Sequence, residues 1–284
     1  MTTLSNKIDF AVIFTVKNAN PNGDPLNGNR PRTDYNNNGE ISDVCIKRKI
    51  RDRLQESGQS IFVQSDEKKI DALPSLRARA ESEEHGLGKN IFNVKKGDFD
   101  TQKEIIKKAC DKWFDVRTFG QIFAYKGSKK GEGVSIPIRG PVSIQFAFSV
   151  QPISVTSTQI TKSVSGEGDG SKKASDTMGM KHRVDNGVYI FFGGMNPQLA
   201  ERTGFTDEDA HAIQALLPRL FENDASSARP EGSMAVLNVF WWEHNCKSGQ
   251  YSSAKVHGSL TVNSDGTHEL KNLVGLEPEI IEGF

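Results

Sequence analysis

The chain has 284 residues, 36% hydrophobic and 25% charged, values ordinary for a globular protein of one large domain or two small ones. Its 36 basic and 36 acidic side chains give a formal net charge of zero, so total charge alone does not indicate a nucleic-acid partner. The N-terminus lacks the pattern of a secretory signal, and no apolar run approaches the roughly 20 residues of a membrane-spanning helix, so we expect a cytoplasmic protein with no membrane partner.

A central strand and a helix are predicted in the N-terminal part of the chain. The run Ile8–Val16 is β-rich and apolar on both faces, which indicates a strand inside a sheet. It leads into Asn18–Arg32, a segment dense in Asn, Pro and Gly that excludes a helix or an interior strand. A helix is then predicted to begin after the N-cap residue Ser42 and to end at Gly58. Its apolar face recurs every fourth residue, at Ile46, Ile50 and Leu54.

The middle of the chain contains a helix, an alternating strand and a long polar stretch. Amphipathic spacing predicts a helix over Lys103–Phe114. The alternation in Pro141–Val150 predicts a strand with one apolar face, made of Val142, Ile144, Phe146, Phe148 and Val150. Ser154–Asp185 has hardly an apolar residue, so it is either a disordered loop or an extended hairpin that lies across nucleic acid or a neighbouring subunit.

The C-terminal part adds two strands with a helix between them. Gly187–Gly194 and Met234–Trp242 are predicted strands, and Thr206 caps the intervening helix, which Pro218 shortens. After Lys255 we expect a short hairpin followed by irregular chain. In order, the strong elements give an α+β fold with the ferredoxin-like β-α-β-β-α-β pattern, whose two insertions are surface lobes that serve binding.

Basic side chains gather on the first predicted helix. Lys47 and Arg51 lie four residues apart and therefore share a face, with Arg48 beside them. Cations at this spacing suit the phosphates of a single nucleic-acid strand, and Arg30 and Arg32 in the preceding loop favour the same interpretation. The alternative is an ordinary solvated helix face.

Near its middle the polar stretch carries a large apolar side chain, Met178, close to Lys181 and His182. An exposed apolar wedge can enter an opened base step, so this segment is a second candidate for nucleic-acid contact. None of the predicted strands carries the aromatic string of an RNA-recognition motif, so base recognition on the sheet face is not predicted.

Cysteine and histidine spacing does not indicate a disulfide or a metal site. The three cysteines are an odd number without a C-x-x-C pair, which predicts reduced thiols. His244, Cys246 and His257 resemble half of a zinc site, but the second ligand pair is absent. No phosphate-cradling glycine motif occurs either. We therefore predict no metal and no cofactor.

Several motifs resemble the backbone subunit of the type I-C CRISPR Cascade complex, a member of the RAMP superfamily. They occur in the same order as in that family and cover most of the chain. The most specific are N-P-N-G-D-P at Asn20–Pro25, S-D-V-C-x-K-R-K-I-R at Ser42–Arg51 and D-V-R-T-F-G at Asp115–Gly120. Further segments are Arg139–Pro152, Asp176–His182 and Thr203–Ala210.

The resemblance implies a single RAMP-type domain over residues 1–284. An RRM-like palm is expected over about 1–56, 115–152 and 186–262, a finger-like insertion over 57–114 and a thumb hairpin over 153–185. The implied function is non-catalytic: copies form a helical filament on CRISPR guide RNA, whose bases then pair with target DNA in antiviral defence. Implied partners are other Cascade subunits at the filament ends and a recruited helicase-nuclease.

Carried over position by position, the resemblance places guide-RNA contacts on the loop, the basic helix, the D-V-R-T-F-G segment and the thumb. The expected RNA-binding residues are Asn20, Asn22, Arg32, Ser42, Lys47, Arg48, Arg51, Arg117, Thr118, Phe119, Gly120, Arg139, Met178, Lys181 and His182. Because guide sequences vary, such a protein must hold phosphates and leave base edges free for pairing.

Two enzymatic alternatives remain. Related backbone subunits of type III systems cut RNA with a loop aspartate and a metal ion. In this chain Asp24, Asp34 and Asp43 are the candidates for that aspartate. The sequence shows no cluster of carboxylates that would hold the metal. A guide-processing ribonuclease would need a general base, and the N-terminal part of the chain has no histidine. We therefore expect no catalytic residue and no enzyme activity.

Overall fold

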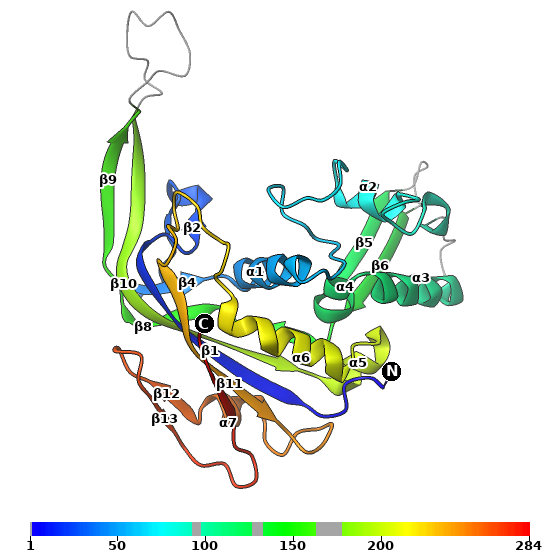
Figure 1. Ribbon diagram of the computed structural model, residues 1–284. Coiled ribbons are helices and arrows are strands. Elements are labelled where there is room, and N and C mark those ends of the chain that lie inside the picture. The colour runs from blue at the N-terminus through cyan, green and yellow to red at the C-terminus, as the bar shows by residue number, and fades with distance from the viewer. Residues whose placement is uncertain (1, 93–97, 127–132, 163–177) are drawn as a thin grey trace, which may run out of the picture.

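The predicted central strand lies in the middle of a large antiparallel sheet (Figure 1). The computed structural model describes residues 2–92, 98–126, 133–162 and 178–284. Strand β1 (Ile8–Ala19) pairs with β10 (Met178–Met195) on one side and with β11 (Met234–Glu243) on the other. The sheet is completed by β14 (Glu279–Glu282) beside β11, and by β8 (Ala147–Pro152) and β4 (Asn38–Ile41) beyond β10. Strands β7 (Val142–Ile144) and β9 (Val155–Thr161) also pair with β10.

Helices α1 (Asp43–Glu56) and α6 (Asp207–Leu216) pack into one hydrophobic cluster with the sheet. As predicted, α1 buries Ile46, Ile50 and Leu54, against alternate side chains of β1 such as Phe10 and Phe14. The intervening side chains Ala11 and Ile13 belong to another cluster with the C-terminal segment. That segment comprises α7 (Ser253–His257) and the hairpin of β12 (Leu260–Val262) and β13 (His268–Leu270). Because both faces of β1 are covered, its central run Phe10–Phe14 is apolar without interruption.

A further hydrophobic cluster builds a side lobe. It involves α2 (Leu76–Glu81), the 3-10 helix η2 (Lys89–Phe92), α3 (Phe99–Lys112), α4 (Phe114–Phe119) and the hairpin of β5 (Gly120–Lys126) and β6 (Gly133–Arg139). The rings of Phe62, Trp113 and Phe123 meet at its centre. The predicted helix over Lys103–Phe114 in fact begins at Phe99, because Asp98 caps it by accepting the Thr101 N–H at 3.1 Å.

The predicted single strand over Pro141–Val150 is wrong. It is divided into β7 and β8, and the burial pattern shifts by one residue at the break. Val142 and Ile144 are buried, but beyond the break Ala147 and Ser149 are buried while Phe148 is 40% exposed. Between them the Gln145 N–H donates to the Phe192 carbonyl at 2.8 Å, outside the regular ladder. A one-residue shift exchanges the two faces of a strand, which is why the simple alternation failed.

The polar stretch Ser154–Asp185 is a hairpin in its described part. Strand β9 pairs with the first half of β10, from Val155 opposite Val184 to Thr161 opposite Met178. This ladder projects away from the rest of the sheet (Figure 1). Residues 163–177, which belong to the predicted thumb, lie outside the described residues.

The remaining short elements complete the connections. The loop after β1 contains β2 (Gly23–Asp24), the 3-10 helix η1 (Pro25–Asn27) and β3 (Arg30–Pro31). Helix α5 (Pro197–Thr203) follows β10, and α6 passes into the 3-10 helix η4 (Leu217–Arg219) at Pro218, as the sequence predicts. No helix within the described ranges is long and apolar enough to cross a membrane.

Candidate functional site

The predicted phosphate-binding helix is largely neutralised by acids from elsewhere in the chain. Arg51 Nε lies 2.9 Å from Asp115 Oδ2, and the Arg51 side chain is only 13% exposed. The same carboxylate accepts the backbone N–H groups of Phe62 at 2.7 Å and Val63 at 3.0 Å. Arg51 therefore joins α1 to the side lobe through a buried carboxylate, and its guanidinium also lies 5.0 Å from the centre of the Phe119 ring.

Asp224 gathers the cations on the far side of α1. Lys49 is buried and ion-pairs with Asp224, and Arg48 and Arg229 each contact it at 3.0 Å. Burial alone would raise the pKa of Asp224, but these cations hold it below its ordinary value. Burial also lowers the pKa of Lys49, although Asp224 opposes that shift. Arg48 makes a further contact of 2.6 Å with Asp52, so these two helix cations are committed to internal pairs.

Lys47 is the predicted helix residue best placed to meet a ligand. Its ammonium pairs with Asp43 at 2.9 Å, one turn earlier, and both side chains remain partly exposed. Exposed pairs of this kind contribute only about 0.3–0.5 kcal/mol, so Lys47 can exchange Asp43 for a phosphate at little cost. The Lys47 ammonium also lies 5.9 Å from the centre of the Phe119 ring.

The D-V-R-T-F-G segment forms a joint between helices. Arg117 of α4 makes two bonds of 2.8 Å to the carboxylate of Asp209 in α6. Thr118 is fully buried. Gly120 has φ +80°, and a Cβ there would meet the Ile138 carbonyl oxygen, so a side chain does not fit. Arg139, by contrast, is exposed at the end of β6 and has no ion pair among the described residues.

Three polar residues expected to contact RNA are used to shape the loop before α1. The Asn20 side chain donates to the Asn29 carbonyl at 2.6 Å and is buried. Asn22 Oδ1 accepts both the N–H of Ser42 at 2.9 Å and its hydroxyl at 3.0 Å. Ser42 is the N-cap residue of α1, as predicted, but its hydroxyl donates to Asn22 and makes no capping hydrogen bond to the helix.

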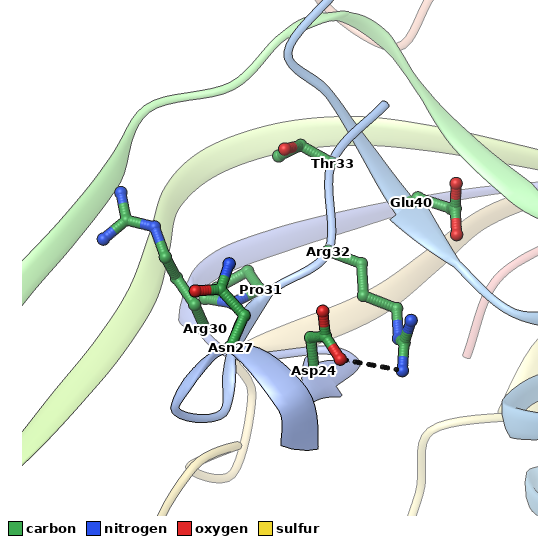
Figure 2. Close-up of a pocket in the computed structure, with 7 residues that line it drawn as sticks. All are labelled: Asp24, Asn27, Arg30, Pro31, Arg32, Thr33 and Glu40. Atoms are coloured by element: carbon green, nitrogen blue, oxygen red, sulfur yellow. Dashed lines mark ion pairs between the residues drawn. The ribbon is translucent and has the colours of Figure 1, made fainter. Parts of the chain in front are cut away.

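A polar pocket of about 140 Å³ opens in this loop (Figure 2). Arg32 Nη2 lies 3.4 Å from Asp24 Oδ1 inside it. Arg30 turns away from that pair and donates to Ser157 Oγ of β9 at 2.7 Å. The same hydroxyl lies 2.8 Å from His182 Nδ1, so the pocket is connected to the hairpin. The full lining is Asp24, Asn27, Arg30, Pro31, Arg32, Thr33 and Glu40. Glu40 was missed because nothing distinguishes it in the sequence from an ordinary surface acid.

The hairpin presents exposed apolar side chains beside its cations. Met178 is 60% exposed and Met180 is 55% exposed, and Ile160 of the opposing strand is also half exposed. Two residues apart, the methionines share one face of β10. The sequence interpretation named Met178 alone, although this period of two could have identified Met180. Lys181 is exposed on the opposite face and has no carboxylate partner among the described residues.

The candidate catalytic acids have structural partners. Asp24 accepts the Leu26 N–H at 3.2 Å at the start of η1, and Asp43 holds Lys47. Asp34 Oδ1 accepts the N–H groups of Asn36 and Asn38, both at 2.8 Å. Desolvation would raise the pKa of Asp34, but these bonds, with one from the Asn38 side chain, together lower it below its ordinary value. The described part of the chain contains no group of three or more His, Cys, Asp or Glu side chains arranged to hold a metal ion.

The fold separates Cys246 from the two histidines of the half zinc motif. His244 and His257 both face Asp9 on β1, at 3.0 and 3.3 Å, while Cys246 is exposed elsewhere. His244 Nδ1 accepts the Gln250 N–H at 2.9 Å, which leaves Nε2 as the donor to Asp9. These histidines tie the C-terminal segment to the sheet.

Comparison with known proteins identifies a family. The family model described as CRISPR-associated protein Cas7 matches residues 6–276. A curated protein from Haloferax volcanii, also described as CRISPR-associated protein Cas7, is 25% identical over an alignment that covers 99% of this chain and 82% of the relative. A solved chain of a pre-nicking CRISPR RNA-guided surveillance complex aligns with a TM-score of 0.47 and 19% identity. The alignment covers 83% of this chain and 75% of the solved chain. A chain of another CRISPR RNA-guided surveillance complex aligns with a TM-score of 0.47 and 18% identity, covering 92% and 77%.

Proposed function

The chain belongs to the Cas7 family of CRISPR-associated proteins, and from this premise we propose that it is a non-catalytic backbone subunit that binds CRISPR guide RNA. Copies stack along the guide as the filament of a type I-C Cascade complex in the cytoplasm, and the exposed guide bases pair with target DNA. Other Cascade subunits close the filament ends, and a helicase-nuclease joins the complex. The motifs at Asn20–Pro25, Ser42–Arg51 and Asp115–Gly120 support the type I-C assignment.

One observation carries the proposal: Arg30 in the loop and Lys181 on the hairpin lack a carboxylate partner among the described residues, and the exposed methionines lie on the same hairpin. Arg30, Arg139 and Lys181 have no carboxylate partner in the described ranges, whereas Arg48, Arg51 and Arg117 do. Cations without an internal carboxylate keep their charge available to replace the counterions of a phosphate backbone. Met178 and Met180 give the hairpin the apolar surface that a wedge between stacked bases requires.

The palm assignment is part of the same proposal. We assign the RRM-like core to β1, β8, β10 and β11 with helices α1 and α6, since the strand order β11-β1-β10-β8 is that of a ferredoxin-like sheet. The finger-like lobe then includes the β5–β6 hairpin, which shares the hydrophobic cluster of residues 62–116. The C-terminal segment packs against the face on which an RNA-recognition motif binds bases, so this subunit holds its guide by the backbone instead.

We expect Arg30→Ala, Arg139→Ala and Lys181→Ala each to weaken binding of single-stranded RNA several-fold, because each removes a cation available to a phosphate. The slope of log affinity against log salt should fall by about 0.7 for each phosphate that the variant no longer neutralises. Affinity is measured by fluorescence anisotropy at a series of salt concentrations, for two RNAs of unrelated sequence. Lys103→Ala removes an exposed cation from the lobe and is the matched control. A loss confined to one RNA sequence would contradict phosphate binding, because phosphates carry no sequence information.

We also propose that the subunit cuts nothing, against the alternative of a metal-dependent RNA endonuclease of the type III kind. Asp24, Asp34 and Asp43 each stabilise a turn, a helix start or an ion pair, so we expect Asp24→Ala, Asp34→Ala and Asp43→Ala to leave guide and target RNA intact, as the unmodified protein does. The assay incubates protein, guide and matched RNA or single-stranded DNA with Mg²⁺ or Mn²⁺. Evenly spaced fragments that disappear in one of these variants would establish the endonuclease.

A further inference from the structure

The loop pocket contains an unpaired donor and an unpaired acceptor that the proposed phosphate contacts do not explain. Arg32 Nε is buried and has no hydrogen-bond partner. The carboxylate of Glu40 also has neither a cation nor a donor among the described residues. Figure 2 shows Glu40 on a separate segment from the Asp24–Arg32 pair and outside that ion pair. A volume of about 140 Å³ admits one small group of a ligand and not a whole drug-sized molecule.

The pocket lies between the two parts of the proposed RNA path. On one side it adjoins the start of α1, because the Arg32 N–H donates to the Asn22 carbonyl at 3.2 Å and the Asn22 side chain accepts from Ser42. On the other side Arg30 reaches Ser157 and through it His182 of the hairpin. A single RNA strand bound by both Lys47 and Lys181 would pass the opening of this pocket.

An unpaired carboxylate on such a path needs an explanation. Phosphate oxygens are acceptors and carry negative charge, so they would be repelled by Glu40. The backbone of DNA offers no hydrogen-bond donor. The backbone of RNA offers one, the ribose 2′-hydroxyl, and this group allows proteins to distinguish RNA from DNA. Acidic side chains bind ribose hydroxyls in the same way in dinucleotide-binding folds.

We infer that this pocket holds one ribose of the guide, with Glu40 accepting the 2′-hydroxyl and Arg32 donating to the adjoining phosphate. The pocket thereby selects RNA over DNA. This inference rests on the proposed function, since it specifies which backbone the subunit accepts. It separates two roles in the loop: cations set affinity for any single strand, and Glu40 sets the preference for RNA.

The test compares the same sequence as RNA, as DNA and as 2′-O-methyl RNA, binding to the unmodified protein and to Glu40→Ala. We expect the unmodified protein to prefer RNA over both analogues by about tenfold, the value of a hydrogen bond to a charged group. In Glu40→Ala this preference should disappear, with the affinity for DNA unchanged or higher. Glu67→Ala removes an exposed acid from the lobe and should leave the preference unchanged.

The outcomes separate the inference from the proposed function. RNA binding without any preference over 2′-O-methyl RNA, or a preference that persists in Glu40→Ala, would overturn the ribose pocket and leave guide binding standing. An unmodified protein that binds neither nucleic acid would overturn the proposed function and the pocket with it. The 2′-O-methyl comparison on the unmodified protein tests recognition of the 2′-hydroxyl whether or not Glu40→Ala folds.

Discussion

Asp115→Ala should destabilise the protein by about 3–5 kcal/mol, the cost of removing one partner from a buried ion pair. Asp115 is buried and accepts three hydrogen bonds, from Arg51 and from the backbone N–H groups of Phe62 and Val63. Alanine would leave a largely buried guanidinium and two backbone donors without acceptors, each of which costs free energy. The side lobe should loosen from α1, and the midpoint of urea unfolding should fall accordingly.

The control for this prediction lies one turn away. Asp111→Ala changes the same residue type, but the Asp111 side chain is 64% exposed and, within the described ranges, ion-pairs with Lys107 alone, at 3.7 Å. Its effect should stay within about 0.5 kcal/mol, as for other surface substitutions. If Asp115→Ala were as mild as Asp111→Ala, the account of Arg51 as a structural residue would be wrong. A variant of Arg51 is accordingly a poor probe of RNA binding, because it disturbs Asp115 first.

Asp9→Ala should cost a similar amount, about 3–5 kcal/mol, and should also change the response to acid. Asp9 is completely buried and contacts Lys7 at 3.1 Å as well as the two histidines. Burial would raise the pKa of Asp9, but its contacts with His244, His257, Ser253 and Lys7 lower it far below its ordinary value. Removing the carboxylate leaves a cation and two imidazoles without their acceptor, so the C-terminal segment should detach first.

The direction of the pH effect follows from the depressed pKa. In the unfolded chain Asp9 takes up a proton near pH 4, while in the folded chain it stays ionised to lower pH. Its stabilising contribution is therefore complete above about pH 4 and declines as the pH falls below that value. Thermal unfolding between pH 3 and pH 7 should be less steeply pH-dependent in Asp9→Asn than in the unmodified protein. Glu243→Asn, at an exposed position on the neighbouring strand, should keep the original dependence; equal curves for all three proteins would refute the role of Asp9.

The sequence predicted the helices whose positions are set by neighbouring residues, through apolar spacing and capping. The four-residue repeat of Ile46, Ile50 and Leu54 located α1, and Thr206 with its capping box located the start of α6. The break between β7 and β8 was not predictable, because a one-residue shift in register depends on the pairing with β10 and not on the alternation itself. Strand β14 was likewise missed, since it is an edge strand whose short sequence gains its structure only from β11.

The site was predicted less well than the fold, because the partners of its charged side chains lie far away in the sequence. The acids that neutralise Arg51, Arg117 and Lys49 lie 64, 92 and 175 residues away, so the basic helix looked free in the sequence. The cations that stay available, Arg30, Arg139 and Lys181, are isolated in the sequence and gave a weak signal. Glu40 could be recognised only after the loop folded around it to make a pocket.

The most direct test of the account is the mass and nucleic-acid content of the purified chain, expressed with a CRISPR array and measured by light scattering with absorbance at 260 and 280 nm. A backbone subunit should elute as particles of several copies that contain RNA of uniform length, and high salt should release that RNA. Particles lacking RNA, or a nucleic-acid-free monomer at low salt, would contradict the claim that this chain assembles on a guide.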